Sequence, residues 1–168
     1  MGAVTPPGLL PTDQYIASLA RKRMAAGVLF RDPDDRILLV EPSYKPSWDI
    51  PGGVVEDNES PWRAATRELA EELDWHRPFG RLLVVDYVHR DDTDAVVFVF
   101  DGGIMTETEV DSLTFPDGEI LSAAFHTIPE ARARTTPLLG DRLASALDAT
   151  GHPTTVLCEQ GQGLRANR

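Results

Sequence analysis

Residues 49–75 read DIPGGVVEDNESPWRAATRELAEELDW, and this stretch decides the fold. Ser60 followed by Pro61 is typical of a helix start, with serine as the N-cap and proline at the first helical position. The spacing of apolar residues after this start favours a helix over about 61–73. The stretch therefore predicts a tight Gly-Gly turn that leads into one amphipathic helix.

Three glutamates of the predicted helix, Glu68, Glu71 and Glu72, stand at positions i, i+3 and i+4 and therefore share one face. The adjoining stripe is apolar and consists of Trp62, Leu69 and Leu73. A solvated surface is one interpretation of the glutamates, because exposed glutamate is common. Against it, like charges four residues apart destabilise a helix by about 0.2–0.5 kcal/mol. Arg67 offsets one of these charges through Glu71 but does not neutralise the cluster.

A hard divalent cation is the second interpretation of the glutamate face. Mg²⁺ takes oxygen ligands, keeps several waters and is commonly held by one or two carboxylates together with substrate phosphate. Before the helix, Pro51-Gly52-Gly53 lets bare backbone come close, so the Gly52 carbonyl is a candidate further ligand. A tight connection between a strand and the helix explains the two glycines equally well.

The rest of the chain alternates apolar β-type runs with helical segments. Strands are expected at 24–30 and 36–40, paired across the turn DPDD, and at 81–90 and 95–100, paired across DDTD. The polar loop 101–118 follows, in which DGG is interpreted as a turn. The remaining expected elements are a strand at 119–128, a Pro-started helical segment and an amphipathic helix at 137–150.

The chain is interpreted as a single domain over 1–168, because no internal repeat and no break in composition divides it. Residues 1–20 are expected to form an N-terminal arm and a short helix, 21–150 the core, and 151–168 a frayed C-terminal tail. Strands and helices interleave without a regular βαβ rhythm. This order favours a mixed sheet between helices over a doubly wound parallel sheet.

Charge and composition narrow the classes of function. With 27 acidic and 16 basic residues, the formal charge is −11, and the chain lacks the broad basic face that binds nucleic-acid backbones or anionic lipid. A long nucleic acid is therefore not an expected partner. No apolar run approaches the ~20 residues that span a bilayer. The single cysteine, Cys158, forms no internal disulfide and the first residues lack signal-peptide features, so a cytoplasmic location is expected.

The spacing of residues 53–75 closely resembles the Nudix box, G-x5-E-x7-R-E-U-x-E-E-x-G-U, in which U is a bulky apolar residue. The matching residues are Gly53, Glu59, Arg67, Glu68, Leu69, Glu71, Glu72 and Trp75. Asp74 replaces the second glycine, where the helix should end in a left-handed residue, a conformation that Asp enters more readily than most residues. The resemblance implies an α/β (α+β) fold over about 21–150, a Nudix-type α/β/α sandwich with a mixed β-sheet between helices.

Resemblance to Nudix hydrolases also implies an activity. It is metal-dependent hydrolysis of a diphosphate linkage in a nucleoside diphosphate derivative or another small organic diphosphate, by attack of water on phosphorus. The implied cofactor is Mg²⁺, with Mn²⁺ as a substitute, because such ions activate water and bind phosphate oxygens. By position, Glu71 and Glu72 are implied as metal ligands, Glu68 as a third ligand or the general base, and the Gly52 carbonyl as a further ligand. Glu59 and Arg67 are implied as an ion pair that supports the site beside Gly53.

The general base stays open, because Nudix enzymes place it either on the box helix or on a later loop. The later loop supplies Glu107, Glu109 and Asp117, and Glu119 at the start of the next strand is the preferred candidate. A solvated loop explains each of these charges as well. Tyr44 and Lys45, in the loop before the box, are candidate substrate-binding residues, although an exposed loop also accounts for them.

Two other classes of function compete with hydrolysis. A regulatory module that binds a nucleotide or diphosphate without turnover usually loses box carboxylates, and all of them are present here. Isopentenyl diphosphate isomerase resembles this fold but relies on a catalytic cysteine, and Cys158 near the C-terminus stands in no such context. The loops outside the box match no substrate signature. Homodimers are common among the proteins that the chain resembles.

Overall fold

A mixed β-sheet forms the centre of the computed structural model, which describes residues 10–89, 91 and 93–164. The strands are β1 (Arg23–Arg31), β2 (Ile37–Pro42), β3 (Gly52–Val54), β4 (Leu82–Val88), β5 (Ala95–Ile104), β6 (Ile120–His126), β7 (Val156–Glu159) and β8 (Gln162–Gly163). Their order is β6-β2-β1-β5-β4-β7-β8, with β3 paired to β1 off this path. The β1–β5 and β4–β7 pairs are parallel and the others antiparallel, which confirms the mixed sheet.

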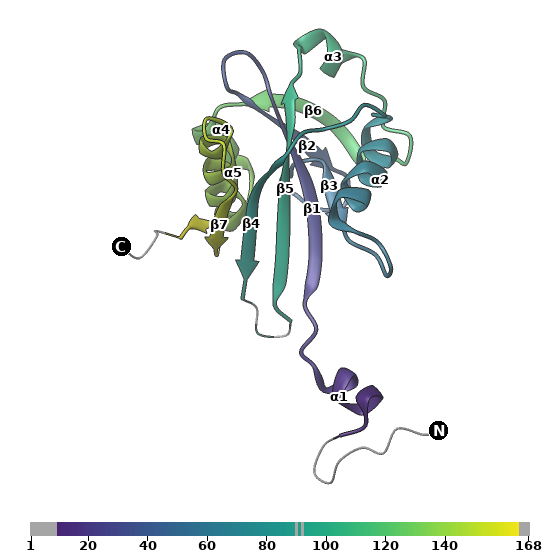
Figure 1. Ribbon diagram of the computed structural model, residues 1–168. Helices are drawn as coiled ribbons and strands as arrows, with labels where there is room; N and C mark the ends of the chain where they lie inside the picture. The colour runs from purple at the N-terminus through teal and green to yellow at the C-terminus, as the bar shows by residue number, and fades with distance from the viewer. Residues whose placement is uncertain (1–9, 90, 92, 165–168) are drawn as a thin grey trace.

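Helices lie on both sides of this sheet (Figure 1). They are α1 (Thr12–Ser18), α2 (Pro61–Leu73), α3 (Glu107–Asp111), α4 (Ile128–Arg134) and α5 (Pro137–Thr150). In Figure 1, α2 covers one side of the sheet and α4 with α5 the other, while α3 lies at one end. This arrangement confirms the α/β/α sandwich that the sequence predicts.

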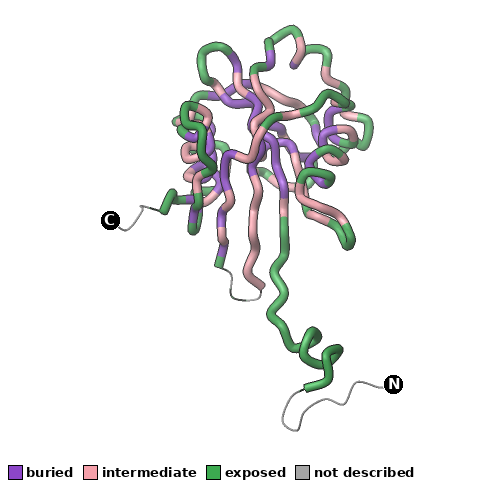
Figure 2. The backbone as a smooth tube through the Cα atoms, viewed as in Figure 1, coloured by how far each residue is buried: buried purple, intermediate pink, exposed green. Residues whose placement is uncertain are grey.

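The core forms because the side chains of β1 alternate between the two faces of the sheet. Val28 and Phe30 pack in one cluster with Leu69 of α2, and Leu29 packs in the other with Leu143 of α5. All five side chains are buried, and each contributes about 1.5–3 kcal/mol of hydrophobic stabilisation. The purple residues of Figure 2 follow the same central strands. The two clusters therefore hold α2 and α5 on opposite faces of β1.

The helix α2 has the bounds that the sequence predicts, with Pro61 at its start. It ends at Asp74, whose φ of 50° and ψ of 34° are left-handed, as expected for the residue that replaces glycine. Ser60 has the extended backbone of an N-cap, but within the described part of the chain its buried Oγ has no hydrogen-bond partner. Trp62 points outward and is 58% exposed, so its assignment to the packed stripe is wrong. The first turn of α2 extends past the residues that pack on the sheet, which begin at Ala64.

Three segments differ from the sequence prediction. The DGG stretch, residues 101–103, is part of β5 and not a turn, because β5 continues beside β1 to the pair Arg31–Ile104. The polar loop after it contains the short helix α3, which a capping box between Thr106 and Glu109 stabilises. Part of the expected tail forms β7 and β8, and β7 pairs with β4. Residues 165–168 lie outside the described residues.

The short helix α1 stands apart from the sheet (Figure 1), and none of its residues is buried (Figure 2). Most of the expected N-terminal arm, residues 1–9, lies outside the described residues. Among the helices of the described residues, none has the length and apolar character needed to cross a membrane.

Candidate active site

The candidate site forms where the short strand β3 meets α2. Gly52 adopts a φ of 143°, and its backbone N–H donates a hydrogen bond of 2.8 Å to the Glu72 carboxylate. Gly53 lies directly under the Glu68 carboxylate, and a Cβ at this position would collide with it. The two glycines therefore let bare backbone approach two box glutamates, as expected, but they lie in strand β3, paired with Gly27 and Ala26 of β1, and not in the predicted Gly-Gly turn.

Glu72 is a buried carboxyl with little positive charge around it. It is 5% exposed, although it lies on the helix face that holds the other box glutamates. Burial raises its pKa to about 8, the charges of Glu68, Asp49 and Asp117 add to this effect, and the Gly52 N–H opposes it. Burial also raises the pKa of Glu68, although the Arg67 guanidinium opposes it. A cation at this site would therefore stabilise the ionised forms of both carboxyls.

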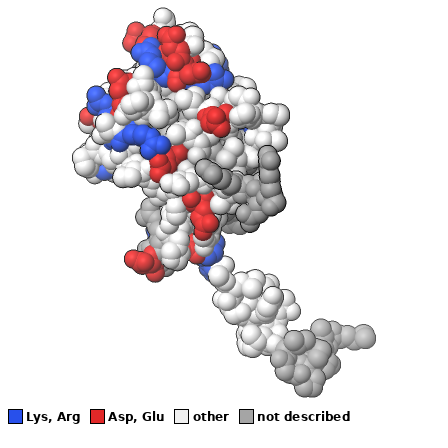
Figure 3. All heavy atoms as spheres, turned by 90° about the vertical axis from the view of Figure 1, so that its left-hand side faces the viewer, with Lys and Arg blue, Asp and Glu red and all other residues white. Residues whose placement is uncertain are grey.

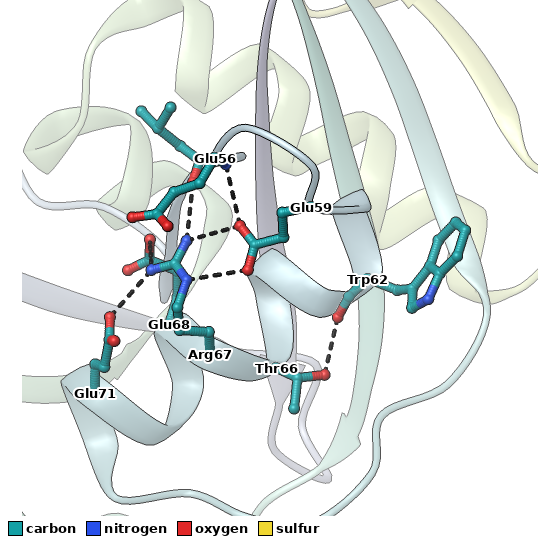
Figure 4. A network of polar contacts seen from close by, with 8 residues as sticks. Glu56, Glu59, Trp62, Thr66, Arg67, Glu68 and Glu71 are labelled. Carbon is teal, nitrogen blue, oxygen red and sulfur yellow. Dashed lines mark hydrogen bonds and ion pairs between the residues drawn. The ribbon is translucent and has the colours of Figure 1, made fainter.

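Arg67 is the centre of the polar network on this helix (Figure 4). It forms ion pairs with Glu59 at 3.0 Å, Glu68 at 2.8 Å and Glu71 at 3.1 Å. Its guanidinium also donates to the Val54 carbonyl at 3.1 Å. The Glu59–Arg67 pair implied by the resemblance is therefore present, and it ties the loop after β3 to α2.

The box glutamates do not converge on one point. Glu71 is half exposed and, like Glu68, turns toward Arg67, whereas Glu72 turns toward Gly52. Within residues 10–89, 91 and 93–164, no group of three or more His, Cys, Asp or Glu side chains is arranged to hold a metal ion. The donors still suit a hard divalent cation, because Glu72 is buried and Glu68 covers bare backbone. Arg67 occupies two of the three carboxylates that such an ion would need.

The loop carboxylates divide into two groups. Glu107 pairs with Arg36 at 2.9 Å, and Glu109 pairs with Arg77 and caps α3, so both anchor the loop. Asp117 accepts a hydrogen bond from the Glu119 N–H at 2.9 Å. The charges of Asp117 and Glu119 contribute to the raised pKa values of Glu72 and Glu68, respectively. The structure therefore brings Asp117 and Glu119 toward the box.

The two candidate residues before the box have different surroundings. Lys45 is partly buried and forms an ion pair of 2.6 Å with Asp49. Tyr44 is 65% exposed, as is usual for a side chain on the protein surface. The Lys45 ammonium lies 5.6 Å from the centre of the Tyr44 ring. Of the two, only Lys45 lines the cavity that adjoins the site.

This cavity has a volume of about 370 Å³, within the range of small-molecule pockets. It lies between β1, β3 and β5, the loop before β3 and the start of α5, and its lining includes Gly52 and Gly53. The polar residues of the lining that the sequence did not indicate include Asp49 and Arg142. Arg142 has a weak signal in the sequence, because it interrupts the buried face of α5 between Leu139 and Leu143.

The model of the NUDIX domain matches residues 21–145. Diphosphoinositol polyphosphate phosphohydrolase 2 of Rattus norvegicus is 45% identical over 64 residues, which are 37% of this chain and 36% of that protein. Diphosphoinositol polyphosphate phosphohydrolase NUDT4B of Homo sapiens is 36% identical over 91 residues, which are 53% of this chain and 48% of that protein. The chain thus spans about half or less of the length of these curated relatives.

Among solved structures, a NUDIX hydrolase from Nitrosomonas europaea superposes with a TM-score of 0.64. It is 20% identical, and the superposition covers 84% of this chain and 80% of that one. At this identity the likeness establishes the fold alone.

Proposed function

The chain belongs to the NUDIX domain family, and on this premise we propose that it hydrolyses a diphosphate linkage in a small organic diphosphate. The observation that carries the proposal is the buried Glu72 carboxyl, which accepts a hydrogen bond from the N–H of Gly52, a residue that lines the cavity. A buried carboxyl with a strongly raised pKa in such a place marks a functional site more often than a structural one.

A divalent cation, Mg²⁺ or Mn²⁺, is the cofactor that we propose. Glu68, Glu71, Glu72 and the Gly52 carbonyl would hold it. The Glu68 and Glu72 carboxylates lie against the bare backbone of β3, and Glu71 lies on the same face of α2. When bound, the ion supplies an activated water and neutralises charge on the phosphate oxygens. To serve as ligands, Glu68 and Glu71 must release Arg67, which keeps its bonds to Glu59 and the Val54 carbonyl. Arg67 therefore continues to position the turn against α2 after the carboxylates have moved.

The proton of the attacking water needs an acceptor among the carboxylates near the box. Glu119 is our preferred general base, because its exposed side chain stands at the start of β6 and its charge acts on Glu68. Glu68 is the alternative, since its carboxylate covers Gly53. A metal ligand gives up basicity to the ion, which favours the carboxylate outside the ligand set.

The charge of the cavity supports a substrate whose organic part is not highly phosphorylated. Three cations line the cavity, Arg23, Lys45 and Arg142, and none of them is free of interactions within the protein. Asp49 pairs with Lys45, and Asp86 pairs with Arg142. On the face shown in Figure 3, blue side chains alternate with red ones and form no continuous basic surface. A polyanionic ring needs several unneutralised cations. We therefore propose a nucleoside diphosphate derivative or a similar small diphosphate, and not the diphosphoinositol polyphosphate in the names of the relatives.

Hydrolysis of a diphosphate panel, with Mg²⁺ and with Mn²⁺, tests this proposal. Glu72→Gln should lower metal-dependent turnover by at least ~100-fold, because metal catalysis supplies several kcal/mol of transition-state stabilisation. Glu56→Gln is the matched control, since Glu56 is an exposed carboxylate of the loop between β3 and α2. Full turnover by Glu72→Gln contradicts the site. Nucleotide binding without product over hours contradicts the activity and favours a binding module.

A further inference from the structure

A buried ion pair crosses the floor of the cavity, away from the box. Arg142 of α5 donates from Nε to the Asp86 carboxylate of β4 at 2.7 Å, and their side chains are 10% and 0% exposed. The second Asp86 oxygen accepts the Gly161 N–H at 2.9 Å, in the turn between β7 and β8. The Asp86 carboxylate therefore holds the Arg142 guanidinium in place relative to the sheet, and both oxygens of Asp86 accept hydrogen bonds.

Among the residues that the structure describes, the rest of the guanidinium has no partner. Arginine carries about five N–H donors, and the bond to Asp86 uses one of them. Across the described residues, no acceptor contacts either terminal nitrogen of Arg142, and neither nitrogen is sealed from solvent. Since the side chain is nine-tenths buried and lines the cavity, its free donors open into that cavity. Because these nitrogens are open to solvent, water satisfies them when the cavity is empty, and an acceptor on a ligand can take the place of that water.

The residues around the free N–H donors of Arg142 indicate which kind of ligand acceptor would bind there. The sheet face under the cavity is made of small and apolar side chains, with Ala25 opposite Val97 and Ala95 opposite Val88 in the strand register. Asp86 already neutralises the guanidinium charge. A second phosphate at this position would meet one compensated cation and an apolar wall, whereas a neutral carbonyl oxygen or ring nitrogen needs only the donors.

We propose that Arg142 determines specificity by donating hydrogen bonds to an uncharged acceptor on the base of a nucleoside diphosphate substrate. Asp86 is its positioning residue. The inference rests on the proposed function, because it places the organic part of that substrate in the cavity beside Gly52 and Gly53.

Binding of nucleoside monophosphates tests the inference without any turnover. AMP, GMP, CMP and UMP are titrated into the full chain in Mg²⁺ buffer, and the fluorescence of tryptophan is followed, since Trp48 lines the cavity. Arg142→Lys keeps a cation beside Asp86 but removes the fork of donors. It should raise the Kd of the best-bound nucleotide by about 10- to 100-fold. Arg132→Lys is the control, because Arg132 forms a similar ion pair, with Asp141 at 2.5 Å, on the exposed side of α4.

Ribose 5-phosphate separates recognition of the base from recognition of phosphate. It lacks the base, so Arg142→Lys should leave its Kd within about twofold of the wild type. An equal loss for ribose 5-phosphate would overturn the inference in favour of an anion site. A Kd within about twofold for all four nucleotides, in a folded variant with a lowered Tm, would leave Arg142 a structural role only. No binding of any nucleotide by the wild type would overturn the inference as well.

Two further measurements keep the outcomes distinct. If Arg142→Lys does not fold, the double variant Asp86→Asn with Arg142→Gln removes both charges together, which avoids leaving one charge buried alone. The same loss of nucleotide affinity is expected from it. If the wild type binds a nucleotide through Arg142 but hydrolyses no diphosphate, the proposed activity fails and the inference on Arg142 stands.

Discussion

The same substitution at Gly52 and at Gly53, two adjacent glycines of β3, should have different consequences. In Gly52→Ala, the new methyl group would meet backbone atoms of β1: the Ala26 carbonyl oxygen, and the Gly27 Cα at 2.6 Å. In Gly53→Ala, it would meet the carboxylate of Glu68, which ends a flexible side chain. Backbone in a paired strand cannot move aside, whereas a glutamate can change its rotamer. Gly52→Ala should therefore damage the fold, and Gly53→Ala should damage the site.

The expected loss of stability in each variant follows from the backbone angles and contacts of the two glycines. Gly52 has a φ of 143°, a conformation that costs other residues about 1–3 kcal/mol. Overpacking against β1 adds about 1–3 kcal/mol. The sum is centred on about 4 kcal/mol, which lowers the Tm of a domain of this size by about 8–16 °C. For Gly53→Ala only the displaced Glu68 rotamer contributes, at about 0.5–1.5 kcal/mol, or about 1–6 °C.

Thermal unfolding of the two variants, followed by circular dichroism, measures the damage to the fold. Metal-dependent turnover of the best substrate from the panel, measured well below either Tm, measures the damage to the site. We expect Gly53→Ala to lose at least ~10-fold in turnover while it stays folded, because Glu68 leaves its place over the bare backbone. Equal losses of Tm in both variants, or full turnover by Gly53→Ala, would refute the reasoning.

Two other predictions concern the proton acceptor and the turn before β2. Glu119→Gln should lower turnover by more than ~100-fold while metal affinity is kept, and a near-normal rate would instead assign the general base to Glu68. Burial opposes ionisation of Asp32, but hydrogen bonds from Arg36 and from the turn backbone outweigh it and lower its pKa. The ionised Asp32 carboxylate therefore stabilises the folded protein fully above the pKa of about 3.8 that the group has in the unfolded chain. This stabilisation is lost as the pH falls through the lower pKa of Asp32 in the folded protein. The Tm advantage of the wild type over Asp32→Asn should shrink between about pH 5 and pH 2.5, and a constant advantage would contradict this assignment.

Arg67 has a further consequence for the resting protein. Because its guanidinium pairs with Glu59, Glu68 and Glu71 together, it supplies the positive charge that α2 needs when no cation is bound. Within the described part of the chain, the buried Glu72 carboxylate accepts one hydrogen bond, from the Gly52 N–H. For the proposed cation, the Glu72 carboxylate is therefore already positioned by the backbone, whereas Glu68 and Glu71 would have to release Arg67 in order to bind it.

The features of the fold that depend on residues close together in the chain were predictable from the sequence. The proline at position 61 and the left-handed Asp74 set the two ends of α2 correctly, because each acts on its own backbone angles. The spacing of the box placed its glutamates on one helix for the same reason. Trp62 shows where local signals are insufficient. Its position on the helix places it in the apolar stripe, but the side chain is exposed because the sheet does not extend far enough to cover it.

Only the tertiary structure decided the rest, because those features depend on segments that are distant in the chain. β5 continues through Gly102 because the bare backbone there lies against the Phe30 ring of β1. The end of the described chain forms β7 because β4 offers it a parallel edge. Arg142 acquires a candidate role only when Asp86, 56 positions earlier in the sequence, fixes its guanidinium beside the cavity. The sequence alone determines the box and its helix, and the fold determines which side chains surround the substrate, since long-range contacts leave no local pattern.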